Sequence, residues 1–127
     1  MYFVSNRTGN HEIFRTTRAS TNNAFDIPLA VGELNSTAGE HSPVLSQDEL
    51  EIFFGSYRLH SSNDIFHARR LSTSDGFGVP MLVAELSGAT SEDYPNWVSP
   101  DRCQLIFTSD REGGSGGLDL WIATRPQ

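Results

Sequence analysis

Phe107-Thr108-Ser109-Asp110-Arg111 is one of three versions of the same short stretch. The other two are Phe3-Val4-Ser5-Asn6-Arg7 and Phe54-Gly55-Ser56-Tyr57-Arg58, and the final arginines of the three lie 51 and 53 residues apart. A fixed period of this length indicates a repeat architecture, in which each unit is one supersecondary module. We therefore interpret the 127 residues as consecutive copies of such a module.

Further blocks recur with the same period. An acid, two apolar residues and a second arginine follow each copy, as Glu12 to Arg18, Asp64 to Arg70 and Asp119 to Arg125. The block from Phe25 to Leu29 returns 52 residues later as Phe77 to Met81, and the block that begins at Pro43 returns at Pro95. The unit of about 52 residues thus contains four short segments, and we predict that each is a strand.

The composition of these segments favours an all-β chain. Residues 50–54 and 104–108 are nearly continuous apolar runs, which suit strands covered on both faces. Pro28 and Pro80 remove a ladder donor, so their segments are expected to be edge strands. No helical periodicity of useful length interrupts this pattern.

Four antiparallel strands per repeat, covered on both faces and ending in an edge strand, are typical of a β-propeller blade. With the strands named A to D from the inside, we predict strands B–D in residues 1–35, A–D in 41–87 and A–C in 93–125. The chain then holds about 2.5 to 3 blades, whereas propellers close with typically four to eight. We expect a longer protein, or a second copy of the chain, to complete the ring.

The third repeat resembles the TolB-like, WD-type (PD-repeat) β-propeller family. The resemblance rests on Ser99-Pro100-Asp101, on residues 105–111 and on Asp119-Leu120-Trp121. It implies a six- or seven-bladed, non-catalytic propeller that serves as an interaction platform and is often periplasmic or secreted. The second repeat departs from the pattern with Gln47-Asp48 in place of Pro-Asp, and no signal peptide precedes Met1.

Composition excludes several classes of function. Sixteen acids against nine bases, all of them arginine, give a net charge of −7, which argues against a nucleic-acid partner. No apolar run reaches the roughly 20 residues of a membrane span, so membrane insertion is not expected. Cys103 is the sole cysteine, which rules out an internal disulfide, and we expect it to be a small core residue.

The recurring arginine and acid are expected to pair across the hairpin between strands B and C. These pairs are Arg7 with Glu12, Arg58 with Asp64, and Arg111 with Asp119. Because the set occurs in every repeat, we assign it a structural role and predict that specific function lies where the repeats differ.

The loops that differ between repeats supply the candidate ligand-binding residues. Glu40, His41, Glu92 and Asp93 are predicted to share one acidic loop face that engages a protein or peptide. Trp97 lies on an inner strand, where it either lines the central channel or packs against the next blade. The histidines lack zinc-ligand spacing and no nucleophile motif is present, so we predict no metal, no cofactor and no catalytic residue.

Two alternatives remain open at this point. In the first alternative, the propeller segment is a substrate-gating module of a hydrolase. In the second it binds a saccharide through Trp97 and Tyr94.

Overall fold

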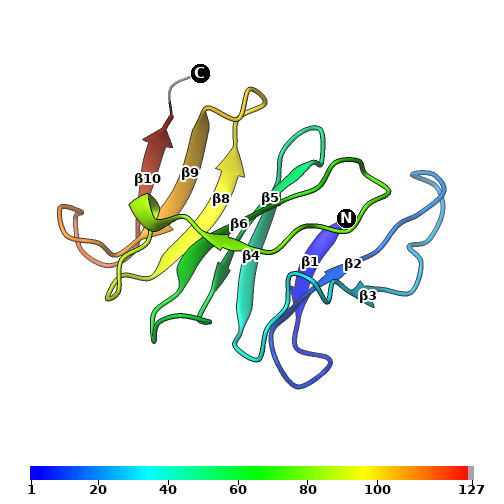
Figure 1. The fold of residues 1–127 in the computed structure, drawn as a ribbon, viewed down its shortest axis with the longest axis horizontal. Coiled ribbons are helices and arrows are strands. Elements are labelled where there is room, and N and C mark those ends of the chain that lie inside the picture. The colour runs from blue at the N-terminus through cyan, green and yellow to red at the C-terminus, as the bar shows by residue number, and fades with distance from the viewer. Residues whose placement is uncertain (126–127) are drawn as a thin grey trace.

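The computed structural model describes residues 1–125 as ten short β-strands and one turn of 3₁₀ helix. The elements are β1 (Tyr2–Ser5), β2 (Glu12–Arg15), β3 (Leu29–Ala30), β4 (Glu40–Leu45), β5 (Glu51–Ser56), β6 (Asp64–Arg69), β7 (Met81–Leu82), η1 (Ala84–Leu86), β8 (Asp93–Val98), β9 (Gln104–Ser109) and β10 (Asp119–Thr124). They form three antiparallel sheets in the orders β1-β2-β3, β4-β5-β6-β7 and β8-β9-β10. Figure 1 shows the second sheet between the first and the third.

The register of the strands repeats from sheet to sheet. In each sheet the aromatic residue of the repeated stretch lies opposite an aromatic residue of the next strand, as Phe3 with Phe14, Phe54 with Phe66 and Phe107 with Trp121. In the first two sheets the paired rings stack with centroids 6.0 Å apart. The all-β prediction is thereby confirmed, and the register shows which residues of the three sheets are equivalent.

The edge strands are short and follow a proline. β3 begins immediately after Pro28 and β7 immediately after Pro80, and each pairs on one side only. Because proline has no N–H to donate to a strand ladder, each of these sheets ends at the short strand that follows the proline. The predicted edge position of these segments is confirmed.

Two apolar cores lie between the sheets. One joins the first and second sheets and contains Ile13, Ile52 and Phe66, and the other joins the second and third and contains Phe53 and Ile65. Alternate residues of β5 therefore enter different cores, and the whole strand is buried. This two-sided burial was expected from the apolar run at residues 50–54.

An arginine joins each of the last two sheets to the segment that follows the sheet before it. Arg58 Nη2 lies 3.1 Å from Glu40 Oε1 and donates to the Leu34 carbonyl at 2.6 Å, while its Nε donates to Ser56 Oγ at 3.0 Å. The guanidinium carbon lies 4.8 Å from the centroid of the Phe66 ring. We name this arrangement the arginine clamp.

The clamp recurs at the junction of the second and third sheets. Arg111 Nη2 lies 2.7 Å from Asp93 Oδ1 and donates to the Leu86 carbonyl at 2.6 Å, and Nε donates to Ser109 Oγ at 2.9 Å. Arg7 keeps the serine and the stacked rings, but no ion pair joins it to an acid within residues 1–125. The acid of each clamp comes from the innermost strand of the same sheet, and the first sheet has no such strand among the described residues.

The expected charge pairs across the B–C hairpins are wrong. The recurring acids contact the hairpin itself: Asp64 Oδ2 lies 2.6 Å from His60 Nδ1, and Asp119 Oδ2 accepts from the Ser115 N–H at 2.6 Å. The arginines instead reach the first acid of the innermost strand of their own sheet while they cover the aromatic pair.

Removing the arginine of a clamp is expected to destabilise the fold strongly. Arg58→Ala leaves the carboxylate of Glu40 buried without a cation, which costs about 3 kcal/mol of unfolding free energy. Arg7→Ala removes only a stacked cation and is the matched control, with an expected loss below about 1 kcal/mol. Urea unfolding measures both, and equal losses would contradict the clamp.

Candidate functional site

Glu40 and Asp93 do not lie on the loop surface. Each begins a strand, and each has an exposed fraction of 0%. Besides its clamp arginine, Glu40 accepts from Ser56 Oγ at 3.1 Å, and Asp93 accepts from Ser91 Oγ at 2.8 Å. The predicted acidic loop face is therefore corrected at these two positions, where the buried carboxylates pair with the clamp arginines of their own sheets.

His41 and Glu92 come together with two tyrosines, in a group that we name the tyrosine cluster. Tyr94 Oη donates to Glu92 Oε2 at 2.8 Å, and Tyr57 Oη lies 3.0 Å from both of these oxygen atoms. The ring of His41 lies edge-on to Tyr57 with centroids 5.4 Å apart. Sequence analysis missed Tyr57. This residue lies between the end of β5 and Arg58, which places it at this end of the sheet.

Burial controls protonation in the tyrosine cluster. It raises the pKa of Tyr94 far above its ordinary value, and hydrogen bonds with Tyr57 and Glu92 add to this effect. Burial, followed by the charge of His11, lowers the pKa of His41 below 6.5 even though Glu40 and Glu92 act in the opposite direction. The tyrosines therefore stay protonated, and the cluster offers hydroxyl groups and one carboxylate that already bind each other.

Trp97 lies on the face of the third sheet that points away from the second. It pairs with Ile106, whose other neighbour across the sheet is Ile122. Trp97 is 45% exposed, Leu120 is 74% exposed and Ile122 is 67% exposed. We call this surface, formed by Trp97, Ile106, Leu120 and Ile122, the outer face.

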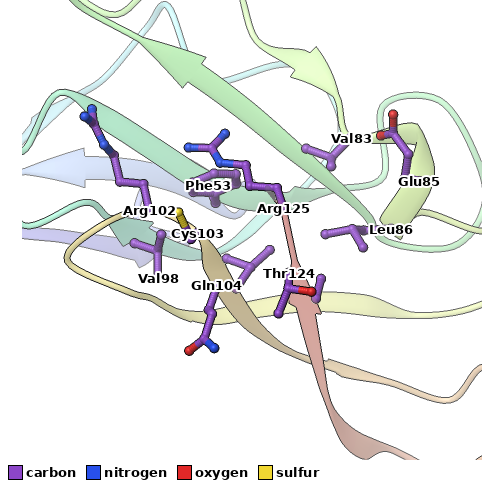
Figure 2. Close-up of a pocket in the computed structure, with 12 residues that line it drawn as sticks. Phe53, Val83, Glu85, Leu86, Val98, Arg102, Cys103, Gln104, Thr124 and Arg125 are labelled. Atoms are coloured by element: carbon purple, nitrogen blue, oxygen red, sulfur yellow. The ribbon is translucent and has the colours of Figure 1, made fainter. Parts of the chain in front are cut away.

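An apolar pocket of about 420 Å³ lies between the second and third sheets, and we name it the inter-sheet pocket. Its apolar lining comes from both sheets and from η1, and includes Phe53, Val83, Leu86, Val98 and Leu105. Cys103 also lines it and is half-buried, rather than part of the core as expected. In Figure 2 the long side chains of Arg102 and Arg125 extend to the same side of the pocket.

A buried glutamate organises the arginines beside the pocket. Glu51 is nearly fully buried, and its carboxylate lies 2.9 Å from Arg69 Nη2, 3.2 Å from Arg102 Nη1 and 3.8 Å from Arg125 Nη2. Burial alone would raise the pKa of Glu51, but the hydrogen bond and charge of Arg69, together with His67, hold it below its ordinary value. One ionised carboxylate thus pairs with three guanidinium groups, of which those of Arg102 and Arg125 line the pocket.

This arrangement suits a ligand with an apolar group and an electron-rich or acidic part. The lining accepts the apolar group, and exposed guanidinium groups bind carboxylates or stack on aromatic rings. Sequence analysis missed the pocket, because Arg125 belongs to a motif that recurs in every repeat and Arg102 lies in a turn. Among residues 1–125, no group of three or more His, Cys, Asp or Glu side chains is placed to hold a metal ion.

Comparison with solved structures shows the class of fold. The chain superposes on the crystal structure of TolB from Acinetobacter baumannii with a TM-score of 0.59 and 22% sequence identity, over 97% of this chain and 26% of that one. The chain thus has a TolB-like β-propeller fold and spans about a quarter of the TolB chain. No protein-family model matches the sequence, and the search of curated proteins gave no match.

The fold class expected from the repeats, blades of a TolB-like propeller, is therefore confirmed. The three sheets of residues 1–125 stack side by side without closing into a ring. No helix in that range is long and apolar enough to cross a bilayer.

The lowered pKa of His41 predicts that stability falls in mild acid. Because the folded state holds a proton on His41 less readily than the unfolded state, the unfolded state binds more protons as the pH falls through 6.5. We expect the unfolding free energy to decrease between about pH 7.5 and 5.5, and the decrease to be smaller in His41→Gln. Urea unfolding at several pH values measures this, and an unchanged slope in the variant would contradict it.

Proposed function

We propose that this chain is a non-catalytic scaffold that binds a peptide segment of a partner protein in the inter-sheet pocket. The observation that carries the proposal is the lining of that pocket, which is apolar at its base and bears Arg102 and Arg125 at its rim. Pockets with this division between an apolar base and a few placed polar groups are typical of binding sites.

The surroundings of the pocket support a preformed site. Its two walls belong to sheets that are joined by a shared core and by the clamp of Arg111. The rim arginines are held by Glu51, so their positions do not depend on a ligand. The scaffold therefore loses little conformational entropy when a peptide binds, which favours binding.

The hydrogen bonds within the tyrosine cluster favour the inter-sheet pocket, and not the loop face, as the binding site. Its tyrosine hydroxyls are bonded to Glu92, and that carboxylate also accepts from the Asn63 N–H at 3.2 Å. A ligand there would have to replace hydrogen bonds that already exist, whereas the pocket presents unfilled apolar surface.

Blocking the pocket through Cys103 tests the proposal. We expect a library of random twelve-residue peptides displayed on phage to yield sequences that bind the protein. Alkylation of Cys103 with a bulky maleimide is expected to abolish that binding, because the thiol lines the pocket.

The matched control is Cys103→Ser treated with the same reagent, which is expected to retain binding. A library that enriches no peptide, or peptides that bind the alkylated protein equally well, would show that the pocket is not a peptide site. Circular dichroism of the alkylated protein confirms that the fold persists.

We also propose that the outer face binds a second copy of the chain. Ile65 occupies the position in the second sheet equivalent to Leu120 and is fully buried by the third sheet. Leu120 and Ile122 lack such a cover among the described residues, and exposed apolar surfaces of this kind favour association. The first sheet offers the matching surface, with the rings of Phe3 and Phe14 beneath Arg7.

Light scattering over a range of protein concentrations tests this association. We expect the wild type to form dimers and the double variant Leu120→Glu, Ile122→Glu to remain monomeric, because charges on the outer face oppose burial. Val79→Glu is the control, since Val79 is even more exposed than Leu120 and Ile122 but lies in the loop before β7. A monomeric wild type would overturn the proposal.

A further inference from the structure

An open groove of about 340 Å³ lies at the end of the second sheet where β5 begins and β6 ends. We name it the arginine groove, because Arg69, Arg70 and Arg102 line it together with a single acid, Glu51. Arg102 is the one residue that lines both this groove and the inter-sheet pocket. The chain as a whole has a net charge of −7, so three arginines around one acid form a local region of opposite sign that attracts anions.

Two of these arginines converge on one atom. Arg69 Nη2 donates to Glu51 Oε1 at 2.9 Å, and Arg102 Nη1 donates to the same oxygen at 3.2 Å. His67 Nε2 lies 2.9 Å from the other oxygen, Oε2. Figure 2 shows the side chain of Arg102 extending away from Val98, which lines the inter-sheet pocket. The buried carboxylate of Glu51 therefore holds the two guanidinium groups side by side.

Most donors on these two guanidinium groups remain available. Within residues 1–125, Nε and Nη1 of Arg69 and Nε and Nη2 of Arg102 have no acceptor. The two side chains are 64% and 39% exposed, so a ligand in solution reaches them. Arg70 differs, because its side chain is buried and donates to the carbonyl groups of Glu49 and Thr73. An anion in the groove thus meets two guanidinium forks, and such forks match the oxygen atoms of phosphate.

This set of charges belongs to one repeat. Glu51 and Arg69 lie opposite each other on β5 and β6, and the equivalent pair in the third sheet is Gln104 and Thr124. Thr17 occupies the position of Arg69 in the first repeat. Interactions that build the stack of sheets recur from repeat to repeat, as the clamps do. A charge set that occurs once is therefore a candidate for a specific function.

The first junction shows that these positions stay open when the next sheet is in place. The complete second sheet and its loops follow the first sheet, yet Thr17, in the position of Arg69, is exposed. Glu49 occupies the position of Arg102 in the equivalent turn, where the two residues have φ angles of 59° and 61°. The side chain of Glu49 is 57% exposed. A following sheet therefore leaves the arginine groove accessible.

A leucine gives the groove an apolar edge. Leu71 lines it beside Arg70 and is 95% exposed, and the half-buried Leu50 also lines it. In the first repeat the position of Leu71 is held by Ala19, which is exposed as well, so this is not a core position. A ligand held by the arginines thus has apolar surface within reach. The volume of the groove suits a small molecule, since ligand sites begin at about 300 Å³.

We infer that the arginine groove binds a small organic phosphate monoester. The phosphate lies between Arg69 and Arg102, and the organic group lies against Leu71. A phosphate monoester has three terminal oxygen atoms and can accept from both guanidinium groups at once, whereas a carboxylate has two and is matched by a single fork. This site goes beyond the proposed peptide-binding function and does not depend on it.

Asp48 opposes the ligand and provides a sensitive test. Its Oδ2 lies 3.4 Å from Arg102 Nη1, where a negative charge repels a phosphate. Its Oδ1 separately accepts from Ser46 Oγ at 2.6 Å and from the Leu50 N–H at 3.2 Å. Asp48→Asn retains an oxygen for these two bonds and removes the charge. We therefore expect this variant to bind the phosphate ligand severalfold more tightly than the wild type.

Titration of phenyl phosphate into the full chain at low salt, followed by NMR, tests the inference. We expect a Kd of about 1 mM or lower and shifts of the Nε–H signals of Arg69 and Arg102. Inorganic phosphate is expected to bind severalfold more weakly, because it lacks the ring that contacts Leu71. Benzoate has the ring but carries a carboxylate, and it is expected to bind at least about tenfold more weakly than phenyl phosphate.

Variants of the protein identify the groups that hold the phosphate. Arg69→Ala and Arg102→Ala are each expected to weaken binding of phenyl phosphate about tenfold or more. Arg69→Lys keeps a cation beside Glu51, so the fold is retained, yet binding is expected to weaken severalfold because an ammonium group lacks the fork. Arg15→Ala is the matched control, since it removes an exposed arginine of β2 that lies outside the groove. Circular dichroism checks the fold of each variant.

Three outcomes would overturn the inference. The first is that the wild type shows no saturable binding of phenyl phosphate. The second is that benzoate binds as tightly as phenyl phosphate, which would mean that the groove does not recognise the phosphate group. The third is that Arg15→Ala weakens binding as much as Arg69→Ala, which would mean that the ligand responds to overall charge and not to this groove. Peptide binding that is blocked at Cys103 is measured separately, so each result is interpreted on its own.

Discussion

The arginine clamp is the interaction on which the stacking of the sheets depends. Glu40 and Asp93 are fully buried at the start of the innermost strands, and a buried carboxylate is tolerated only when it is paired and hydrogen-bonded. Arg58 and Arg111 supply that pairing and also bind a carbonyl group of the preceding segment. The same guanidinium therefore satisfies the acid of its own sheet and links that sheet to the segment that follows the preceding one.

Because the clamps make every junction alike, differences between junctions stand out. The junction of the first two sheets contains Phe77, whereas its counterpart contains a pocket of about 420 Å³.

The prediction of the fold succeeded because it used spacing. The period of the Phe3, Phe54 and Phe107 stretches established the module, and proline at positions 28 and 80 established the edges. The candidate site was harder, because the acids at positions 40 and 93 look like loop residues in sequence yet lie at the first pair of a strand. Of the predicted set, His41 and Glu92 do meet, but in a cluster completed by Tyr57, which no motif marked.

The sequence by itself determined the all-β class and the repeat period, because apolar runs and turn residues act over a few positions of chain. Only the tertiary structure decided which acid each arginine meets, which apolar surface stays open and where a pocket forms. Those outcomes depend on contacts between residues of different repeats, such as Arg125 with Glu51, and their distance in space is set by how the sheets stack.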